Sequence, residues 1–173
     1  MSVAENLKDI EVLDLTGNPV RLGLLWVDHS VVLAFVRHFG CILCREHVGQ
    51  LNAALGSIRR CGAELVIVGC GQPEQAKDFC AAQNVKSPVF IDPEQKAYRA
   101  AGLKRGLWSS LRPKAWSNSL RAYRAGIRQG PTQGDPFQQG GVFVFRPGNI
   151  TAYSYISDAA GDHPPVDEVV AAV

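Results

Sequence analysis

Long hydrophobic segments are absent from this sequence of 173 residues. The most apolar run, residues 31–36, is followed directly by Arg37 and His38, and it is far shorter than the roughly 20 residues that span a bilayer. Residues 2–5 include a glutamate and form no hydrophobic leader, which favours a cytoplasmic protein over an exported one. The sequence therefore predicts a soluble chain without a membrane span.

Two signatures of other protein classes are also missing. No glycine-rich nucleotide fingerprint is present, so the sequence predicts neither direct NADPH binding nor another cofactor. The five cysteines are an odd number, and Cys61, Cys70 and Cys80 lie in apolar or helical segments where small core residues are expected. This pattern favours the reducing cytoplasm over a disulfide-stapled secreted domain.

Acidic residues are missing between Glu94 and Asp135, a segment that holds nine of the 18 basic residues. Because the formal net charge of the whole chain is only +2, the remainder is negative and the basic charge is concentrated in this segment. Trp108 and Trp116 follow a helix-like spacing, which predicts a helical insert over about residues 104–128. We expect the insert to roof the fold rather than to bind nucleic acid, since no nucleic-acid-binding motif is present.

What is present is a regular alternation of strand-like and helix-like segments. Apolar runs and alternating patterns predict strands, whereas apolar residues three and four apart predict helices. In chain order we expect a hairpin at residues 10–22, a strand at 31–36, a helix from Cys44 to about Arg60, a strand at 63–69, a helix from Pro73, a strand at 89–91, a helix at 94–101, the insert, a hairpin at 142–156 and a helix at 165–173. The connections between the buried strands are long enough for parallel crossovers.

This order of elements predicts a single α/β domain over residues 1–173. The 46% hydrophobic content suffices for one core, and no internal repeat or linker separates a second unit. A strand, a Cys-x-x-Cys segment, a helix and further strands in this order are typical of a thioredoxin-like fold. We therefore expect a central mixed sheet flanked by helices, with an N-terminal β-hairpin and the helical insert before the last hairpin.

Cys41 and Cys44 form the Cys-x-x-Cys segment, at the point where the buried strand is followed by a helix. Unpaired backbone N–H groups and the helix dipole stabilise a thiolate at a helix N-terminus, and the spacing suits a disulfide. We predict a redox pair in which Cys41, preceded by the flexible Gly40, attacks an oxidised substrate and Cys44 resolves the product. The alternatives are a pair that only packs and a zinc site completed by His47. Because no fourth ligand has the usual spacing, we predict no metal.

Charged neighbours of the pair are expected to tune it. Arg37, His38 and Arg45 would raise the local positive potential and lower the thiol pKa, while Glu46 would accept a proton or pair with Arg45. The alternative for Arg37 and His38 is that they only lead the chain from the strand into solvent. Two other histidines have no partner pattern and are expected at the surface, namely His29 and His163.

Five separated blocks of the sequence carry a more specific resemblance. They are FVRHFGCILCRE at residues 35–46, IDPEQKAY at 91–98, GLKRG at 102–106, GDPFQQGG at 134–141 and RPGN at 146–149. In this order they resemble the peroxiredoxin-like 2 family, within the alkyl hydroperoxide reductase and thiol-specific antioxidant superfamily. The resemblance extends from about residue 10 to the C-terminus. The chain is most similar to the antioxidant-enzyme-domain-containing branch, and a sister branch is described as reducing prostaglandin-type endoperoxides.

The resemblance implies a thiol-dependent oxidoreductase, an antioxidant enzyme with a redox-active disulfide between Cys41 and Cys44. It implies that the protein reduces a small oxidised substrate, either a peroxide, an endoperoxide or a disulfide, and that thioredoxin or a similar dithiol donor regenerates it. True peroxiredoxins carry Thr or Ser three residues before the attacking cysteine, a place that Cys41 occupies relative to Cys44. Cys44 thus stands at the peroxidatic position of those enzymes, and the order in which the two cysteines act stays open.

Two further places are expected to meet the substrate. Gly140 and Gly141 enter the late strand where true peroxiredoxins have an arginine, and their small size would leave the backbone open to a substrate. Trp108, in the insert, would supply an apolar wall of the pocket. The alternative to an enzyme is a non-catalytic thioredoxin-like binding module, in which the basic, aromatic insert engages a partner or a membrane surface.

Overall fold

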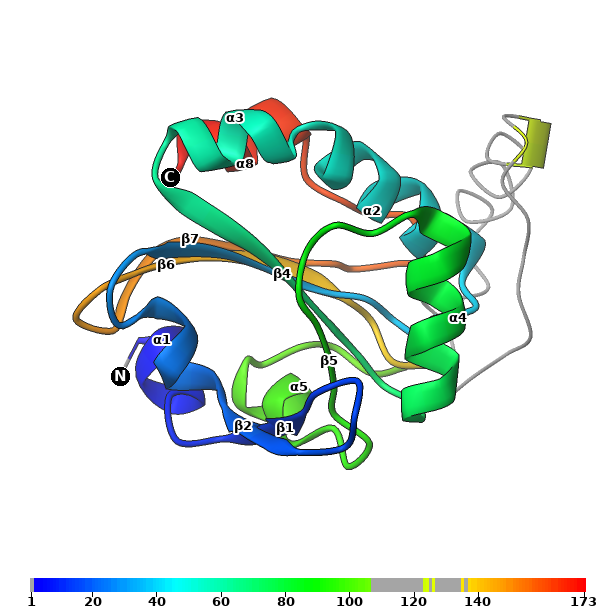
Figure 1. The fold of residues 1–173 in the computed structure, drawn as a ribbon, viewed down its shortest axis with the longest axis horizontal. Helices are drawn as coiled ribbons and strands as arrows, with labels where there is room; N and C mark the ends of the chain where they lie inside the picture. Colours follow the sequence, from blue (N-terminus) through cyan, green and yellow to red (C-terminus); the bar gives the residue numbers. More distant parts are fainter. Residues whose placement is uncertain (1, 107–122, 125, 127–134, 136) are drawn as a thin grey trace.

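The structure of the protein is a computed structural model, which describes residues 2–106, 123, 124, 126, 135 and 137–173. Most of the predicted insert, including Trp108 and Trp116, lies outside these residues. The described ranges form a layered α/β structure in which helices lie on both faces of one sheet (Figure 1). Among the helices of these ranges, none combines the length and the apolar character of a membrane span.

Seven strands form a mixed sheet in the order β2-β1-β5-β4-β3-β6-β7. The three central strands β3, β4 and β5 are parallel, whereas β1, β2, β6 and β7 pair with their neighbours in antiparallel fashion. Their bounds are β1 Glu11–Leu13, β2 Pro19–Arg21, β3 Ser30–Phe35, β4 Ala63–Gly69, β5 Val89–Ile91, β6 Gly141–Arg146 and β7 Ile150–Ile156. The predicted mixed sheet, N-terminal hairpin and last hairpin are therefore confirmed.

Helices α2, α3, α4 and α8 cover one face of the sheet, and α1, the 3-10 helix η1 and α5 cover the other (Figure 1). Their bounds are α1 Val3–Leu7, η1 Leu22–Trp26, α2 Ile42–Ala53, α3 Leu55–Arg60, α4 Pro73–Gln83, α5 Lys96–Ala100 and α8 Val166–Ala171. The apolar periodicity after Cys44 predicted one helix, but the structure divides it into α2 and α3 at Ala54. The sequence pattern also missed α1, because five residues are too few to show a period.

Strand β3 is buried on both of its faces, as its continuous apolar run predicts. Val31, Leu33 and Phe35 pack with the layer of α1 and α5, whereas Val32 and Ala34 pack with the layer of α2, α3 and α8. The C-terminal end of β3 therefore lies in the interior of the sheet, flanked by β4 and β6. Residues 36–41 lead from this end into α2.

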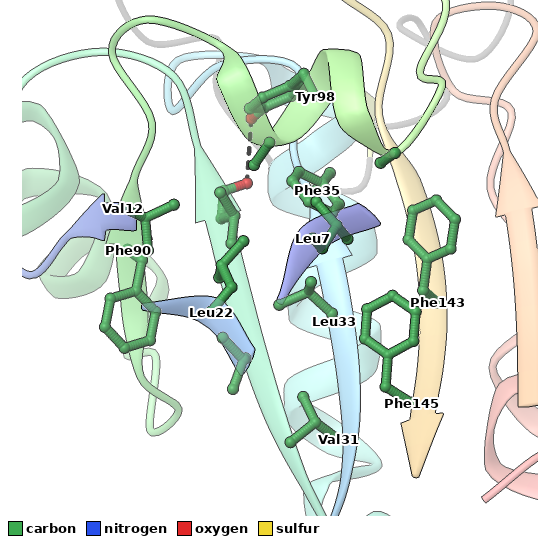
Figure 2. Close-up of a cluster of buried hydrophobic side chains, with 14 of the residues drawn as sticks. Leu7, Val12, Leu22, Val31, Leu33, Phe35, Phe90, Tyr98, Phe143 and Phe145 are labelled. Carbon is green, nitrogen blue, oxygen red and sulfur yellow. Dashed lines mark hydrogen bonds between the residues drawn. The ribbon is translucent and has the colours of Figure 1, made fainter. Parts of the chain in front are cut away.

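An aromatic cluster fills the layer between the sheet and α5 (Figure 2). The rings of Phe35 and Tyr98 meet edge to face with centroids 5.0 Å apart, and Phe143 packs against Phe35 at 5.9 Å. Figure 2 shows the Tyr98 hydroxyl directed toward the sheet, and it lies 3.2 Å from the backbone carbonyl of Val68 at the end of β4. This cluster places a polar atom beneath the strand ends that lead to Cys41.

Candidate active site

Cys41 is the N-cap residue of α2, and Cys44 lies in the first turn. The Cys41 backbone is extended, with φ −68° and ψ 119°, and its carbonyl accepts a hydrogen bond from the Arg45 backbone N–H at 3.0 Å. Both cysteines are free thiols, 4% and 1% exposed. The first turn of a helix leaves backbone N–H groups without helical partners, so this position suits a negatively charged sulfur.

The two thiols are hydrogen-bonded to each other, and this bond makes one acidic and the other not. The Cys44 thiol donates to the Cys41 sulfur and, with the Arg37 charge and the backbone N–H groups of Cys44 and Leu43, lowers the pKa of Cys41 to about 6. The same hydrogen bond, together with burial, raises the pKa of Cys44 well above its ordinary value. Near neutral pH the pair therefore holds one proton, which resides on Cys44.

Arg37 contacts both sulfur atoms. Its Nη1 lies 3.9 Å from the Cys41 sulfur, and its backbone N–H donates to the Cys44 sulfur at 3.3 Å. The side chain is buried rather than directed into solvent, and its Nε donates to the backbone carbonyl of Gln138 at 3.0 Å. Since a buried guanidinium keeps its charge, Arg37 supplies the positive potential that a thiolate at Cys41 needs.

His38 does not add to that positive potential, contrary to the sequence interpretation. The side chain is buried, and burial, followed by the charges of Arg37 and Arg45, lowers the pKa of His38 to about 4. The ring is therefore neutral near pH 7, and the potential around the thiols comes from arginine. Arg45 is half-buried, and its Nε donates to the Phe39 carbonyl at 3.2 Å. Gly40 is buried in the turn before Cys41, and Glu46 is half-buried on α2.

Gly140 and Gly141 are not open backbone for a substrate, which corrects the sequence interpretation. A Cβ on Gly140 would lie 2.3 Å from the Phe35 carbonyl oxygen, and a Cβ on Gly141 would lie 2.7 Å from the Tyr155 carbonyl oxygen. Gly141 pairs with Phe35 in the sheet, and the Gly140 carbonyl accepts from the Ser157 N–H. Both glycines are needed because β6 passes too close to its neighbours for any side chain. Trp108, the third residue expected at the substrate, lies outside the described residues.

His47 and His163 form a stacked pair beside α2. Their ring centroids are 4.3 Å apart with 9° between the ring planes, and both ring nitrogens of His47 are buried. His29 is exposed as predicted. His163 was also expected at the surface, but it is half-buried because its ring stacks on that of His47. Within the described ranges no group of three His, Cys, Asp or Glu side chains is placed to hold a metal ion, so Cys41, Cys44 and His47 do not form a zinc site there.

The stacked pair predicts a loss of stability on acidification. Burial lowers the pKa of His47 to about 3 and that of His163 to about 4, below the ordinary 6.5. Below pH 6.5 these histidines therefore become protonated in the unfolded chain but stay neutral in the folded protein. The stability that is present at neutral pH is lost as the pH falls toward 4. We expect the two histidines together to lower the free energy of unfolding by about 4 kcal/mol between pH 7 and pH 5, measured by urea denaturation.

Variants of single histidines isolate this effect. His47→Phe keeps a ring stacked on His163 but cannot bind a proton, so it should lose at least a third of the pH dependence. His29→Phe, at an exposed position, is the matched control and should keep all of it. An unchanged pH dependence in His47→Phe would show that the stacked pair is not the titrating element.

Three residues beside Cys41 and Cys44 were not predicted to be part of the site. Gln138 accepts from Arg37, the Cys70 sulfur lies 2.9 Å from the Arg37 carbonyl, and the Tyr98 hydroxyl lies 2.6 Å from the Val36 carbonyl. Cys70 is a buried core residue as expected, and it also donates a hydrogen bond to the strand end. Of the other two cysteines expected in the core, Cys61 is exposed at the end of α3 and Cys80 is half-buried, which corrects the sequence interpretation. Gln138 and Tyr98 lie in two of the sequence blocks that carry the family resemblance, and this could have indicated that they belong to the site.

Comparison with known families identifies one match. The sequence model described as AhpC/TSA antioxidant enzyme matches residues 50–159. This stretch begins after Cys44, so the match depends on the part of the chain that follows Cys41 and Cys44 rather than on the two cysteines.

Relatives and a solved structure agree with that family. The chain is 36% identical over 179 residues to thioredoxin-like protein AAED1, chloroplastic, from Arabidopsis thaliana, covering 98% of this chain and 72% of that protein. It is 30% identical to peroxiredoxin-like 2C from Homo sapiens, covering 97% and 79% of the two chains. The crystal structure of peroxidoxin BcpB from Mycobacterium tuberculosis superposes with a TM-score of 0.69 at 19% identity, covering 94% of this chain and 90% of that one. At that identity the superposition shows a shared fold.

Proposed function

The chain belongs to the AhpC/TSA antioxidant enzyme family, and we propose that it reduces the O–O bond of a hydroperoxide, with Cys41 as the attacking sulfur and Cys44 as the resolving sulfur. It is a thiol-dependent antioxidant oxidoreductase with a peroxiredoxin-like, thioredoxin-type fold. The observation that carries the assignment of roles is the position of Cys41 at the N-cap of α2, with Arg37 Nη1 3.9 Å from its sulfur, and the lowered pKa of Cys41 agrees with it. Membership of a family of antioxidant enzymes does not favour the alternative, a non-catalytic binding module.

The first step is nucleophilic attack by the Cys41 thiolate on the terminal oxygen of the hydroperoxide. An S–O bond forms as the O–O bond breaks, the alkoxide leaves and takes up a proton from solvent to become the alcohol, and Cys41 becomes a sulfenic acid. The Cys44 sulfur then attacks the Cys41 sulfur, releasing water and forming the disulfide, while the proton that Cys44 carried goes to the departing oxygen. Cys44 holds that proton in the resting pair, which suits the resolving role.

Regeneration needs two electrons from outside the chain. We propose a dithiol donor of the thioredoxin kind, whose thiolate attacks the disulfide and whose second thiol completes the exchange. The five free cysteines suit a reducing compartment such as the cytoplasm, where such donors are available. The donor then leaves oxidised, and Cys41 and Cys44 return as thiolate and thiol.

Burial of the pair sets a condition on this cycle. At 4% and 1% exposure, Cys41 and Cys44 cannot meet a donor protein without a local opening of the turn that ends at Cys41. Cys41 is the more accessible of the two and lies at the end of the helix rather than inside it, so the opening required to reach it is smaller. Access therefore also favours Cys41 as the sulfur that meets substrate and donor.

Intact-mass measurement after stoichiometric hydrogen peroxide tests the proposal. The reduced protein should lose the mass of two hydrogen atoms, and peptide mapping should place the new disulfide between Cys41 and Cys44. Cys44→Ser should instead gain one oxygen atom on Cys41, trapped with a sulfenic-acid reagent. Cys61→Ser removes an exposed thiol at the end of α3 and is the control, which should behave like the wild type. A protein that shows neither change would contradict the proposed function.

A further inference from the structure

The peptide unit between Val36 and Arg37 is hydrogen-bonded at both ends. Its carbonyl accepts from the Tyr98 hydroxyl at 2.6 Å, and its N–H donates to the Cys44 sulfur at 3.3 Å. The C=O and N–H of one planar trans peptide point in opposite directions, so whatever orients the carbonyl also orients the N–H. Tyr98, this peptide and the Cys44 sulfur thus form one continuous chain of hydrogen bonds.

Tyr98 reaches this peptide from the far face of the sheet. It belongs to α5, which lies on the opposite side of the sheet from α2, and its side chain is 0% exposed (Figures 1 and 2). The edge-to-face contact with Phe35 fixes the ring, and the Asp92 carboxylate accepts from the Ala97 N–H at 2.7 Å, which ties the start of α5 to the end of β5. The hydroxyl is therefore held in place by packing rather than by solvent contacts.

The hydroxyl is a permanent donor. Burial, followed by the charges of neighbouring acidic groups, raises the pKa of Tyr98 well above its ordinary value, so the phenol stays protonated. The Val68 carbonyl also lies 3.2 Å from it, but that carbonyl already accepts from the Val36 N–H at 2.9 Å. The shorter contact, to Val36, is the one that a single hydroxyl proton satisfies best.

Cys70 holds the next peptide unit in the same manner. Its sulfur lies 2.9 Å from the Arg37 carbonyl, and burial raises the pKa of Cys70, so it remains a thiol and donates. Tyr98 and Cys70 thus anchor the carbonyls on both sides of the Arg37 Cα. The backbone of the residue that contacts both redox sulfurs cannot rotate without breaking one of these bonds.

We propose that Tyr98 is a positioning residue for the redox pair, which orients and polarises the Val36–Arg37 peptide so that its N–H stabilises negative charge on the Cys44 sulfur. This inference rests on the proposed function, because it concerns the step in which Cys44 loses its proton and attacks the sulfenic acid of Cys41. A donor hydrogen bond favours a sulfur more as its negative charge grows, and a carbonyl that accepts a hydrogen bond makes the N–H of its own peptide a stronger donor. The attack by Cys41 does not use this N–H.

Rapid mixing of the reduced protein with hydrogen peroxide separates the two steps. In Tyr98→Phe, sulfenic acid formation at Cys41 should stay within twofold of the wild type, while disulfide formation should slow about fivefold, the effect of losing one hydrogen bond of ordinary strength. The pH profile of the second step should also move to higher pH, because Cys44 then loses its proton less readily. A purely structural role for Tyr98 would not produce that shift.

Tyr153→Phe is the matched control, since it removes a phenol that bonds to Glu168 on α8 instead of to the strand ends. It should leave both steps unchanged. If Tyr98→Phe does not fold, 3-fluorotyrosine at position 98 keeps the shape and strengthens the donor, and it should move the pH profile of the second step downward.

The outcomes separate this inference from the function on which it rests. A wild-type protein that forms no Cys41–Cys44 disulfide would overturn the proposed function. A wild type that forms it, with a Tyr98→Phe variant that resolves at the same rate and pH, would overturn only the role of Tyr98.

Discussion

Cys41→Ser should lower the rate of peroxide-dependent oxidation of a dithiol donor by about 10³-fold or more, the loss expected when a covalent nucleophile is removed. A serine hydroxyl does not ionise near neutral pH, so the contacts that lower the pKa of Cys41 to about 6 have no anion to stabilise. The measurement is steady-state turnover with thioredoxin and its reductase, followed through the consumption of NADPH by the reductase. Cys61→Ser, which changes an exposed thiol, should keep the wild-type rate.

The companion variant decides the order of the two cysteines. Cys44→Ser should still react once with peroxide, because Cys41 keeps the Arg37 charge and the helix N-terminus, but it should fail to form the disulfide. The reverse result, single turnover in Cys41→Ser and no reaction in Cys44→Ser, would contradict the assignment and place the attack at Cys44. That outcome would match the peroxidatic position inferred from the sequence resemblance.

Gly140→Ala should destabilise the protein by about 3 kcal/mol or more, among the largest effects of a single methyl group. The new Cβ would lie 2.3 Å from the Phe35 carbonyl oxygen, and neither partner can withdraw. Gly140 is held by the bond from Ser157 to its carbonyl, while the next residue, Gly141, pairs with Phe35 in the centre of the sheet. Urea denaturation measures the change in the free energy of unfolding.

Gly49→Ala is the matched control for this prediction. Gly49 lies on the exposed side of α2, and a Cβ there meets nothing within 4 Å. The substitution should stabilise the protein by about 0.5–1 kcal/mol, because alanine loses less backbone entropy than glycine in a helix. A Gly140→Ala protein as stable as the wild type would show that β6 can move away from β3, and Gly140 would again be a candidate substrate contact.

The elements that sequence predicted well are those whose signal is local. The unbroken apolar run before Arg37 indicated a strand buried on both faces, and β3 is such a strand. The position of Cys41 and Cys44 between that run and a periodic segment indicated a helix N-terminus, where the structure has them. Both inferences depend on residues within a few positions of each other, which is the range over which periodicity and capping act.

The errors concern burial, which depends on what other parts of the chain bring near. His38 was predicted to add positive potential beside the thiols, but the fold buries its ring, and burial lowers its pKa to about 4, so the ring is neutral near pH 7. His163 has no partner within its own segment and finds one in His47 on α2. In the sequence, Gly140 was expected to leave the backbone open to a substrate. In the structure the Phe35 carbonyl lies so close that no side chain fits at this position.

By itself the sequence determined the fold class, and it predicted thiol chemistry at Cys41 and Cys44, because two thiols three residues apart at a helix start are close enough for a disulfide and are stabilised there as thiolates. The tertiary structure decided which groups tune that chemistry. Arg37 reaches Gln138 across 101 positions and Tyr98 reaches the Val36 carbonyl across 62. A hydrogen bond needs its two atoms about 3 Å apart in space, whatever their separation in the sequence. Only the folded arrangement of α5, β3 and β6 could therefore bring these partners together.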